Sequence, residues 1–212
     1  MALATVPIKK NGSTDQLFAD VVAKLSADGI KILGALRTLG HSSDRGRCNS
    51  DLCLLPNGPV VKITQKLGAG STACRMDAGA FEEAVGLVTT RFATERADLI
   101  VVNKFGFREA EGHGFRMLIA DAIELGVPVL IGIPGVYRNA FGQFAGEMAT
   151  ELPSEKDVIV NWYKQYRAEL FLPNLMVSSE IPFSASVPNI DGRSETDNGL
   201  VRGASSWKRN KR

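Results

Sequence analysis

Residues 97–114, ADLIVVNKFGFREAEGHG, form the stretch that decides the fold. An apolar, mostly β-branched run at 99–102 is followed at once by the polar pair Asn103-Lys104 and then by a loop rich in charge. Such a run is typical of a strand that is buried on both faces of a parallel sheet. Because open α/β sheets bind ligands outside the carboxyl ends of such strands, we expect a site in this loop.

Helical and strand patterns alternate on both sides of this stretch, and this alternation predicts an α/β fold with three layers and a mostly parallel sheet. A capping-box pattern, Ser13 with Gln16, precedes the first helix. The segments DLCLLP and PVVKITQ flank Asn57-Gly58, which predicts a two-residue β-hairpin, and the neighbouring prolines place it at a sheet edge. The predicted strands are 5–10, 30–36, 99–102 and 127–133, and the predicted helices are 14–27, a helix from Asp77 to Phe92, 115–126, 138–152 and 158–170.

Length and composition indicate one globular domain. The chain has 212 residues, of which 44% are hydrophobic and 23% charged. We predict a single domain at 1–165 and a disordered tail at 166–212, where Ser, Asn, Gly, Pro and charge replace the helical periodicity.

Charge and cysteine usage exclude several classes of partner and compartment. Lys and Arg number 25 against 23 Asp and Glu, and much of the basic excess lies at 208–212, which argues against a nucleic-acid-binding face. We expect no membrane insertion, because no apolar run reaches the roughly 18 residues that a membrane span needs. The N-terminus also lacks the apolar core of a signal peptide, and 3 cysteines fit a reducing compartment, so we expect a cytoplasmic protein.

Two loops carry residues that suit an anion. Lys10, Ser13 and Thr14 lie between the first strand and the first helix, where backbone N–H groups of α/β proteins bind phosphates. The sequence G-x-x-x-x-G-K-[ST] occurs nowhere in the chain, and a lysine pair before a helix cap is the alternative interpretation.

The second such loop is residues 68–75. In it Gly68 and Gly70 permit close backbone approach, Ser71 adds a hydroxyl and Arg75 a planar guanidinium. An ordinary connection between a strand and a helix is the alternative interpretation here.

Soft metal ligands are few. Cys48 and Cys74 are the candidates for a metal site, and buried thiols are the alternative, because the C-x₄-C spacing of Cys48 and Cys53 differs from a common zinc pair. We expect Cys53 to be a core residue of the hairpin.

The central loop supplies the remaining candidates. Asn103 and Lys104 stand where nucleotide hydrolases often carry acids, so Lys104 can instead neutralise an anionic ligand. Glu109, Glu111 and His113 are the candidates for catalysis, His113 as a general base. A network of surface ion pairs is the alternative for the charged residues.

Three segments carry a family resemblance: DLIVVNKFGFREAEGHGFR at 98–116, KITQKLGAGSTACRMDAGAFEEAV at 62–85 and FAGEMATELP at 144–153. Together they resemble an uncharacterised bacterial domain family that is found beside molybdenum-uptake genes and is sometimes labelled as a nucleoside-triphosphatase or transporter ATP-binding protein. The resemblance covers roughly residues 15–155, and N-K-F-G-x-x-E-A-E-G-x-G at 103–114 is its most specific motif. More distantly, the layout is similar to small P-loop nucleoside-triphosphatases, which implies a P-loop-hydrolase-like fold.

The chain departs from the P-loop pattern because it lacks the phosphate loop and the acidic pair. Three functions follow as hypotheses. The first is non-catalytic binding of a small anion, either molybdate or a nucleotide phosphate, in a molybdenum-related or transport context. The second is a divergent nucleoside-triphosphatase in which Glu109 or Glu111 replaces the missing acid. The third is a structural or interaction protein of a transport operon, with transport-system proteins as partners.

Overall fold

The apolar run at 99–102 forms the central strand of a seven-stranded sheet. The computed structural model describes residues 2–9, 12–38, 51–65 and 75–171. Along the chain the elements are β1 (Leu3–Pro7), α1 (Ser13–Ala27), β2 (Ile32–Arg37), β3 (Asp51–Leu55), β4 (Val60–Lys62), β5 (Thr64–Gln65), β6 (Arg75–Met76), α2 (Ala78–Thr94), β7 (Leu99–Val102), α3 (Phe107–Ala110), α4 (Arg116–Glu124), β8 (Val129–Ile133), the 3-10 turn η1 (Gly135–Tyr137), α5 (Arg138–Ala145), β9 (Ala149–Glu151) and α6 (Lys156–Phe171).

The strand order β4-β3-β2-β7-β8-β1-β9 contains one switch in the direction of winding. Strands β2, β7, β8, β1 and β9 are parallel. The chain leaves β1 through α1 toward β2, but it leaves β8 through α5 toward β9, on the other side of β1. The topological switch point therefore lies between β1 and β8.

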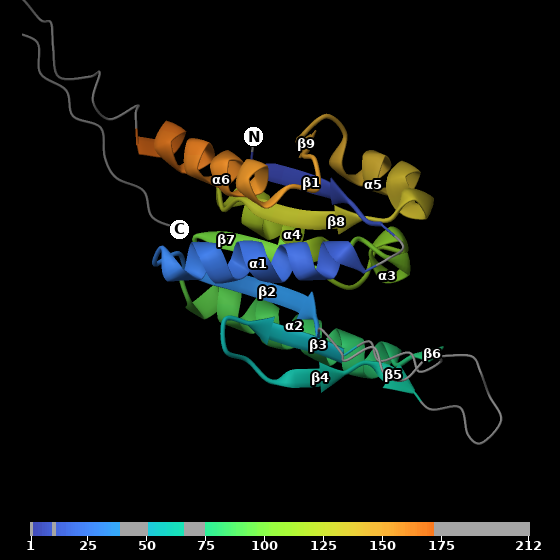
Figure 1. The fold of residues 1–212 in the computed structure, drawn as a ribbon. Helices are drawn as coiled ribbons and strands as arrows, with labels where there is room; N and C mark the ends of the chain where they lie inside the picture. Colours follow the sequence, from blue (N-terminus) through green and yellow to red (C-terminus); the bar gives the residue numbers. More distant parts are fainter. Residues whose placement is uncertain (1, 10–11, 39–50, 66–74, 172–212) are drawn as a thin grey trace, which may run out of the picture. The chain divides into compact units, whose positions relative to one another are not determined.

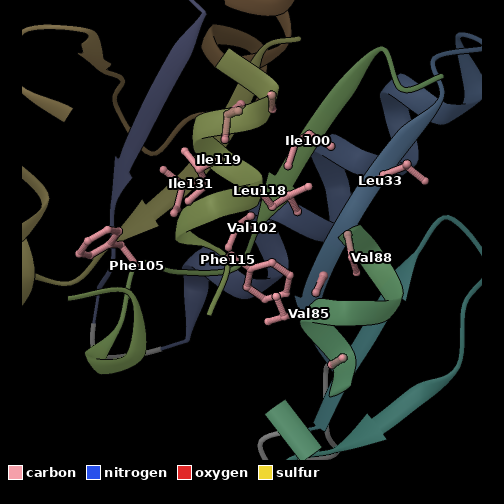
Figure 2. Packing of buried hydrophobic residues seen from close by; sticks show 14 of the residues in the cluster. Leu33, Val85, Val88, Ile100, Val102, Phe105, Phe115, Leu118, Ile119 and Ile131 are labelled. Atoms are coloured by element: carbon pink, nitrogen blue, oxygen red, sulfur yellow. The ribbon is translucent and has the colours of Figure 1, made fainter. Parts of the chain in front are cut away.

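Helices cover both faces of the sheet, which makes three layers and confirms the predicted fold class. Helices α1 and α6 pack on one face through Phe18, Val21, Ile159 and Tyr163. The opposite face carries α2, α4 and α5 (Figure 1). Figure 2 shows side chains of α2 and α4 packed toward the central strands, with Leu118 near Val102.

The predicted hairpin forms at the edge of the sheet. β3 pairs antiparallel with β2 and with β4, which is the outermost strand. The turn is longer than the predicted two residues, since Gly58 N donates to Leu54 O at 2.7 Å and Leu54 N donates to Pro59 O at 3.2 Å. Cys53 lies in β3 and is half-buried, not fully buried in the core as predicted.

Two local predictions are wrong. The helix predicted at 138–152 ends at Ala145, because Gly146 has a φ of 53° and the chain continues into the edge strand β9 beside β1. The predicted capping box is absent, since Gly12 is the N-cap residue of α1 with a φ of 74° and no side chain caps the helix. Gln16 instead donates to Asp20.

The last described helix runs past the predicted domain boundary at residue 165. α6 ends at Phe171. The predicted disordered tail stays a prediction for the residues beyond Phe171. Within the described ranges, no helix is long and apolar enough to cross a membrane.

Candidate functional site

A cavity of about 380 Å³ lies at the carboxyl ends of β2 and β7. Its floor consists of buried apolar side chains, among them Phe81 of α2, Val102 of β7 and Phe115. Its volume falls in the range of small-molecule sites, which are mostly apolar with a few polar groups. The other lining residues are Ala35, Arg37, Leu52, Ile63, Thr64, Met76, Asn103, Lys104, Gly106, Phe107, Arg108, Glu109 and Tyr137.

The Glu109 carboxylate closes the loop after β7 on itself. Its Oε2 accepts a hydrogen bond from Gly106 N at 2.8 Å, and its Oε1 accepts one from Phe115 N at 3.1 Å. The side chain is only 2% exposed. One buried carboxylate thus joins the two ends of residues 106–115 and sets the position of Phe115 in the cavity floor.

We call the two hydrogen bonds of Glu109 to Gly106 N and Phe115 N the Glu109 clamp. This clamp requires a glycine at position 114. The Gly114 φ of 62° is in the left-handed region, and a Cβ there would lie 2.4 Å from Glu109 Oε1. The glycine of the motif therefore leaves room for the carboxylate. This contact accounts for both the glutamate and the last glycine of N-K-F-G-x-x-E-A-E-G-x-G.

Burial raises the pKa of Glu109 above its usual 4.5, and the two backbone N–H donors and the charge of Lys104 oppose that shift. Since both carboxylate oxygens are bound to backbone N–H groups, the described geometry gives Glu109 a structural task. Glu111 lies at the surface, 3.7 Å from Arg108, and His113 is exposed.

Backbone hydrogen bonds hold the start of the loop against both neighbouring strands. Asn103 N donates to Ala35 O at 2.9 Å, and Phe105 N donates to Gly132 O at 2.8 Å. Phe105 is fully buried, with its ring centroid 5.3 Å from that of Phe141. These contacts leave Asn103 and Lys104 at fixed places beside the cavity.

Asn103 is a buried polar residue of the cavity with an unused acceptor. The residue is 8% exposed, and its Oδ1 has no hydrogen-bond partner among the residues that the structure describes. A buried amide oxygen without a partner is costly, so such groups often mark a binding function.

Three cationic side chains, those of Arg37, Lys104 and Arg108, line the cavity. The Arg37 guanidinium lies 3.6 Å from Asp15, and that of Arg108 lies 2.8 Å from Glu82. Burial raises the pKa of Asp15, whereas the charges of Arg37 and Lys104 lower it. Lys104 is exposed, and its charge opposes the rise in the pKa of both Asp15 and Glu109.

The structure brings some of the predicted site residues together and leaves others apart. Asn103, Lys104 and Glu109 line one cavity. Ser13 is exposed, and buried Thr14 accepts a hydrogen bond from Lys9 N at 3.3 Å in the connection after β1, at the switch point. Neither Ser13 nor Thr14 lines the cavity.

Several predicted residues lie outside the described part of the chain. They are Lys10, Cys48, Gly68, Gly70, Ser71 and Cys74. Arg75 begins the short strand β6, which pairs with β5, and its side chain is likewise outside the description. Within the described ranges, no three His, Cys, Asp or Glu side chains form a group that could hold a metal.

Sequence reasoning missed Arg37 and the aromatic part of the cavity. Arg37 ends a parallel strand, so the same carboxyl-end rule that selected Lys104 applies to it. Phe81 and Phe115 carry no such signal, because their helical spacing is that of core residues.

The comparisons with known proteins agree with this architecture. A family model described as "Protein of unknown function (DUF2478)" matches residues 3–162. The chain belongs to the DUF2478 family. Among curated proteins, it is 32% identical over 162 residues to "Molybdenum import ATP-binding protein ModC 2" of Bradyrhizobium diazoefficiens. That match covers 76% of this chain but only 18% of the relative.

Among solved structures, this DUF2478 chain is similar to the solution structure of a human cancer-related nucleoside triphosphatase. The TM-score is 0.52 at 16% identity, and the match covers 84% of this chain and 98% of the other. At this identity the likeness concerns the fold, and it supports the predicted P-loop-hydrolase-like architecture.

Proposed function

We propose that this protein binds a nucleoside phosphate in the cavity beside β7 and does not hydrolyse it. The observation that carries the proposal is the make-up of the cavity: a buried apolar floor, a rim of three cations and one buried amide oxygen without a partner in the described chain. An apolar floor suits a planar base, and a cationic rim suits phosphate oxygens.

The apolar floor favours a nucleotide over bare molybdate. A tetrahedral oxyanion gains from charge and hydrogen-bond donors, which the rim supplies, but it gains nothing from Phe81 and Phe115. The name of the Bradyrhizobium relative, a molybdenum import ATP-binding protein, agrees with a role of this nucleotide site in a transport context.

The absence of hydrolysis is proposed from the side chains beside β7. Asn103 and Lys104 follow this strand, and neither supplies the carboxylate that a nucleotide hydrolase uses for Mg²⁺ or water. Glu109 is the buried carboxylate nearest to them in sequence, and its two oxygens bind backbone N–H groups.

Isothermal titration of the full chain with ATP, GTP and sodium molybdate tests the proposal. We expect a nucleotide to bind with a dissociation constant below about 1 mM and more tightly than molybdate. Lys104→Ala should weaken this binding roughly tenfold, because one charge-assisted contact is removed. Binding of molybdate alone, or of neither class of ligand, contradicts the proposal.

A matched lysine serves as control. Lys24 lies in α1, and its Nζ pairs with Asp28 at 2.8 Å, away from the cavity lining. Lys24→Ala should bind the nucleotide as the wild type does. Phosphate release should not exceed a buffer blank, and release that Glu109→Gln abolishes in a folded protein would favour a nucleoside-triphosphatase instead.

A further inference from the structure

The most exposed aromatic side chain of the cavity lining is that of Phe107. Phe107 begins α3, lines the cavity beside β7 and is 56% exposed. We infer that the ring of Phe107 is the platform on which the base of the nucleotide stacks. This inference rests on the proposed function and adds to it the group that holds the base.

Stacking needs an aromatic face that a ligand can reach, and the other phenylalanine rings at this end of the sheet lie in the core. Phe81 and Phe115 are 8% and 2% exposed, and their ring centroids lie 5.7 Å apart in an edge-to-face contact. Phe105 is fully buried, and Figure 2 shows it and Phe115 among the packed core side chains. In the described lining, the phenyl surface that a ligand can reach is therefore mainly that of Phe107.

The ring of Phe107 has no aromatic partner among the described residues. A single exposed apolar side chain is common on a protein surface and needs no ligand. Here, however, exposed Met76 of β6 and half-buried Tyr137 of η1 line the same cavity as Phe107. Apolar side chains from three separate segments that line one cavity are typical of a binding site.

The Glu109 clamp fixes the backbone that carries this ring. Gly106 N, directly before Phe107, donates to Glu109 Oε2 at 2.8 Å, and Glu111 N donates to Phe107 O at 3.0 Å. A rigid aromatic side chain on a fixed backbone loses little conformational entropy when it contacts a ligand. Phe107 is therefore preorganised for stacking.

The cavity also carries charge for the phosphates. The exposed Lys104 lines it together with Phe107, as does Arg37, whose guanidinium also lies 3.6 Å from Asp15. Every nucleobase has a π-face, so an aromatic platform holds the bases of ATP and GTP alike, whereas the cations contact phosphate oxygens. The base and the phosphates are thus bound by different side chains, and the two contributions can be measured separately.

The test combines removal of the ring with removal of the base. ATP, GTP and inorganic tripolyphosphate, which lacks both base and sugar, are titrated into the wild type and into Phe107→Ala. In the wild type we expect both nucleotides to bind more tightly than tripolyphosphate. Phe107→Ala should weaken both nucleotides roughly 5- to 100-fold, the range of one base–aromatic stack, and leave tripolyphosphate binding unchanged.

Two further variants separate stacking from a structural role. Phe107→Tyr keeps the ring and should bind ATP as the wild type does. Met117→Ala removes an apolar side chain of α4 that is similarly exposed, at 64%, but does not line the cavity, so it should leave ATP affinity unchanged. Because Phe107 is exposed, Phe107→Ala should shift the melting temperature of the ligand-free protein by less than about 2 °C.

Several outcomes would contradict the inference about Phe107 and leave nucleotide binding in place. They are unchanged ATP affinity in Phe107→Ala, an equal loss for ATP and tripolyphosphate, weak ATP binding by Phe107→Tyr, a matching loss in Met117→Ala, and a larger drop in the melting temperature. Failure of every nucleotide to bind the wild type overturns both proposals.

Discussion

The connections after β7 and after β1 both start at the carboxyl ends of parallel strands, but different groups hold them in place. The loop after β7 is held by a buried carboxylate, Glu109, with two charge-assisted hydrogen bonds. The connection after β1, at the switch point, is held in its described part by neutral hydrogen bonds, from Ile8 N to Ile133 O at 3.0 Å and from Lys9 N to Thr14 Oγ1 at 3.3 Å.

The difference indicates which of the two connections is held by the stronger hydrogen bonds. In doubly wound folds the switch point is the usual place for a ligand. Here the buried polar groups, the close glycine contact and the cavity lie away from the switch point, at the carboxyl ends of β2 and β7. Preorganised loops bind at a lower entropic cost, so the loop after β7 is the better support for a site.

The largest effect is expected when the Glu109 carboxylate is removed, because the loop after β7 then loses the group that distinguishes it from the connection after β1. Glu109→Ala leaves the N–H groups of Gly106 and Phe115 buried without acceptors, which should lower the free energy of unfolding by about 2–4 kcal/mol. Urea unfolding measures the change. A loss below about 0.5 kcal/mol would show that the clamp adds little.

Glu109→Gln is the graded control, because the amide keeps one acceptor and should lose only about 1–2 kcal/mol. Burial raises the pKa of Glu109 above 4.5, so the folded protein holds this proton more tightly than the unfolded chain does. The stability of the wild type relative to Glu109→Gln should therefore fall as the pH rises above about 4.5 through the folded pKa. A difference that grows with pH would contradict this sign.

A pair of glycine variants tests how closely residue 114 approaches the Glu109 carboxylate. Gly114→Ala should cost about 2–3 kcal/mol, since it adds a 2.4 Å contact with Glu109 to the left-handed strain. Gly112 has a φ of 91° with nothing within 4 Å of an added Cβ, so Gly112→Ala should cost only about 1 kcal/mol. Thermal unfolding compares the two, and equal costs would mean that the carboxylate gives way freely.

The smallest effect is expected in the connection after β1. Thr14→Val keeps the volume of the side chain and removes the hydroxyl that accepts from Lys9 N, at a cost of about 1 kcal/mol. Thr14→Ser, which keeps the hydroxyl, is the control for that hydrogen bond. A cost for Thr14→Val as large as that of Glu109→Ala would remove the contrast between the two connections.

Much of the fold could be predicted from local patterns. The run at 99–102 predicted the central strand, and Asp77 was correctly predicted to cap α2, where its side chain accepts from Ala80 N at 3.0 Å. The edge strand β9 was missed because its residues, Ala149–Glu151, continue a helical spacing, and its pairing with β1 is a contact between distant parts of the chain. Secondary-structure propensity is a property of the local sequence and does not reflect contacts between distant parts of the chain.

The site was predicted less completely than the fold. The carboxyl-end rule selected Asn103 and Lys104 because it needs only the position of a strand end, and both residues line a cavity. The sequence also suggested Glu109 as a catalytic acid, and in the structure its oxygens bind Gly106 N and Phe115 N. A carboxylate's partners depend on the path of the backbone around it, which spacing alone does not specify.

The sequence by itself determined the alternation of strands and helices and the place where a buried strand becomes polar. Both follow from hydrophobic periodicity, which is a property of neighbours along the chain. Only the tertiary structure decided that Phe81, Val102 and Phe115 share one cavity, that Glu109 is a clamp and that the Asn103 oxygen lacks a partner within the described chain. These are matters of burial and of hydrogen-bond partners brought together by folding, and they decide what the loop after β7 can bind.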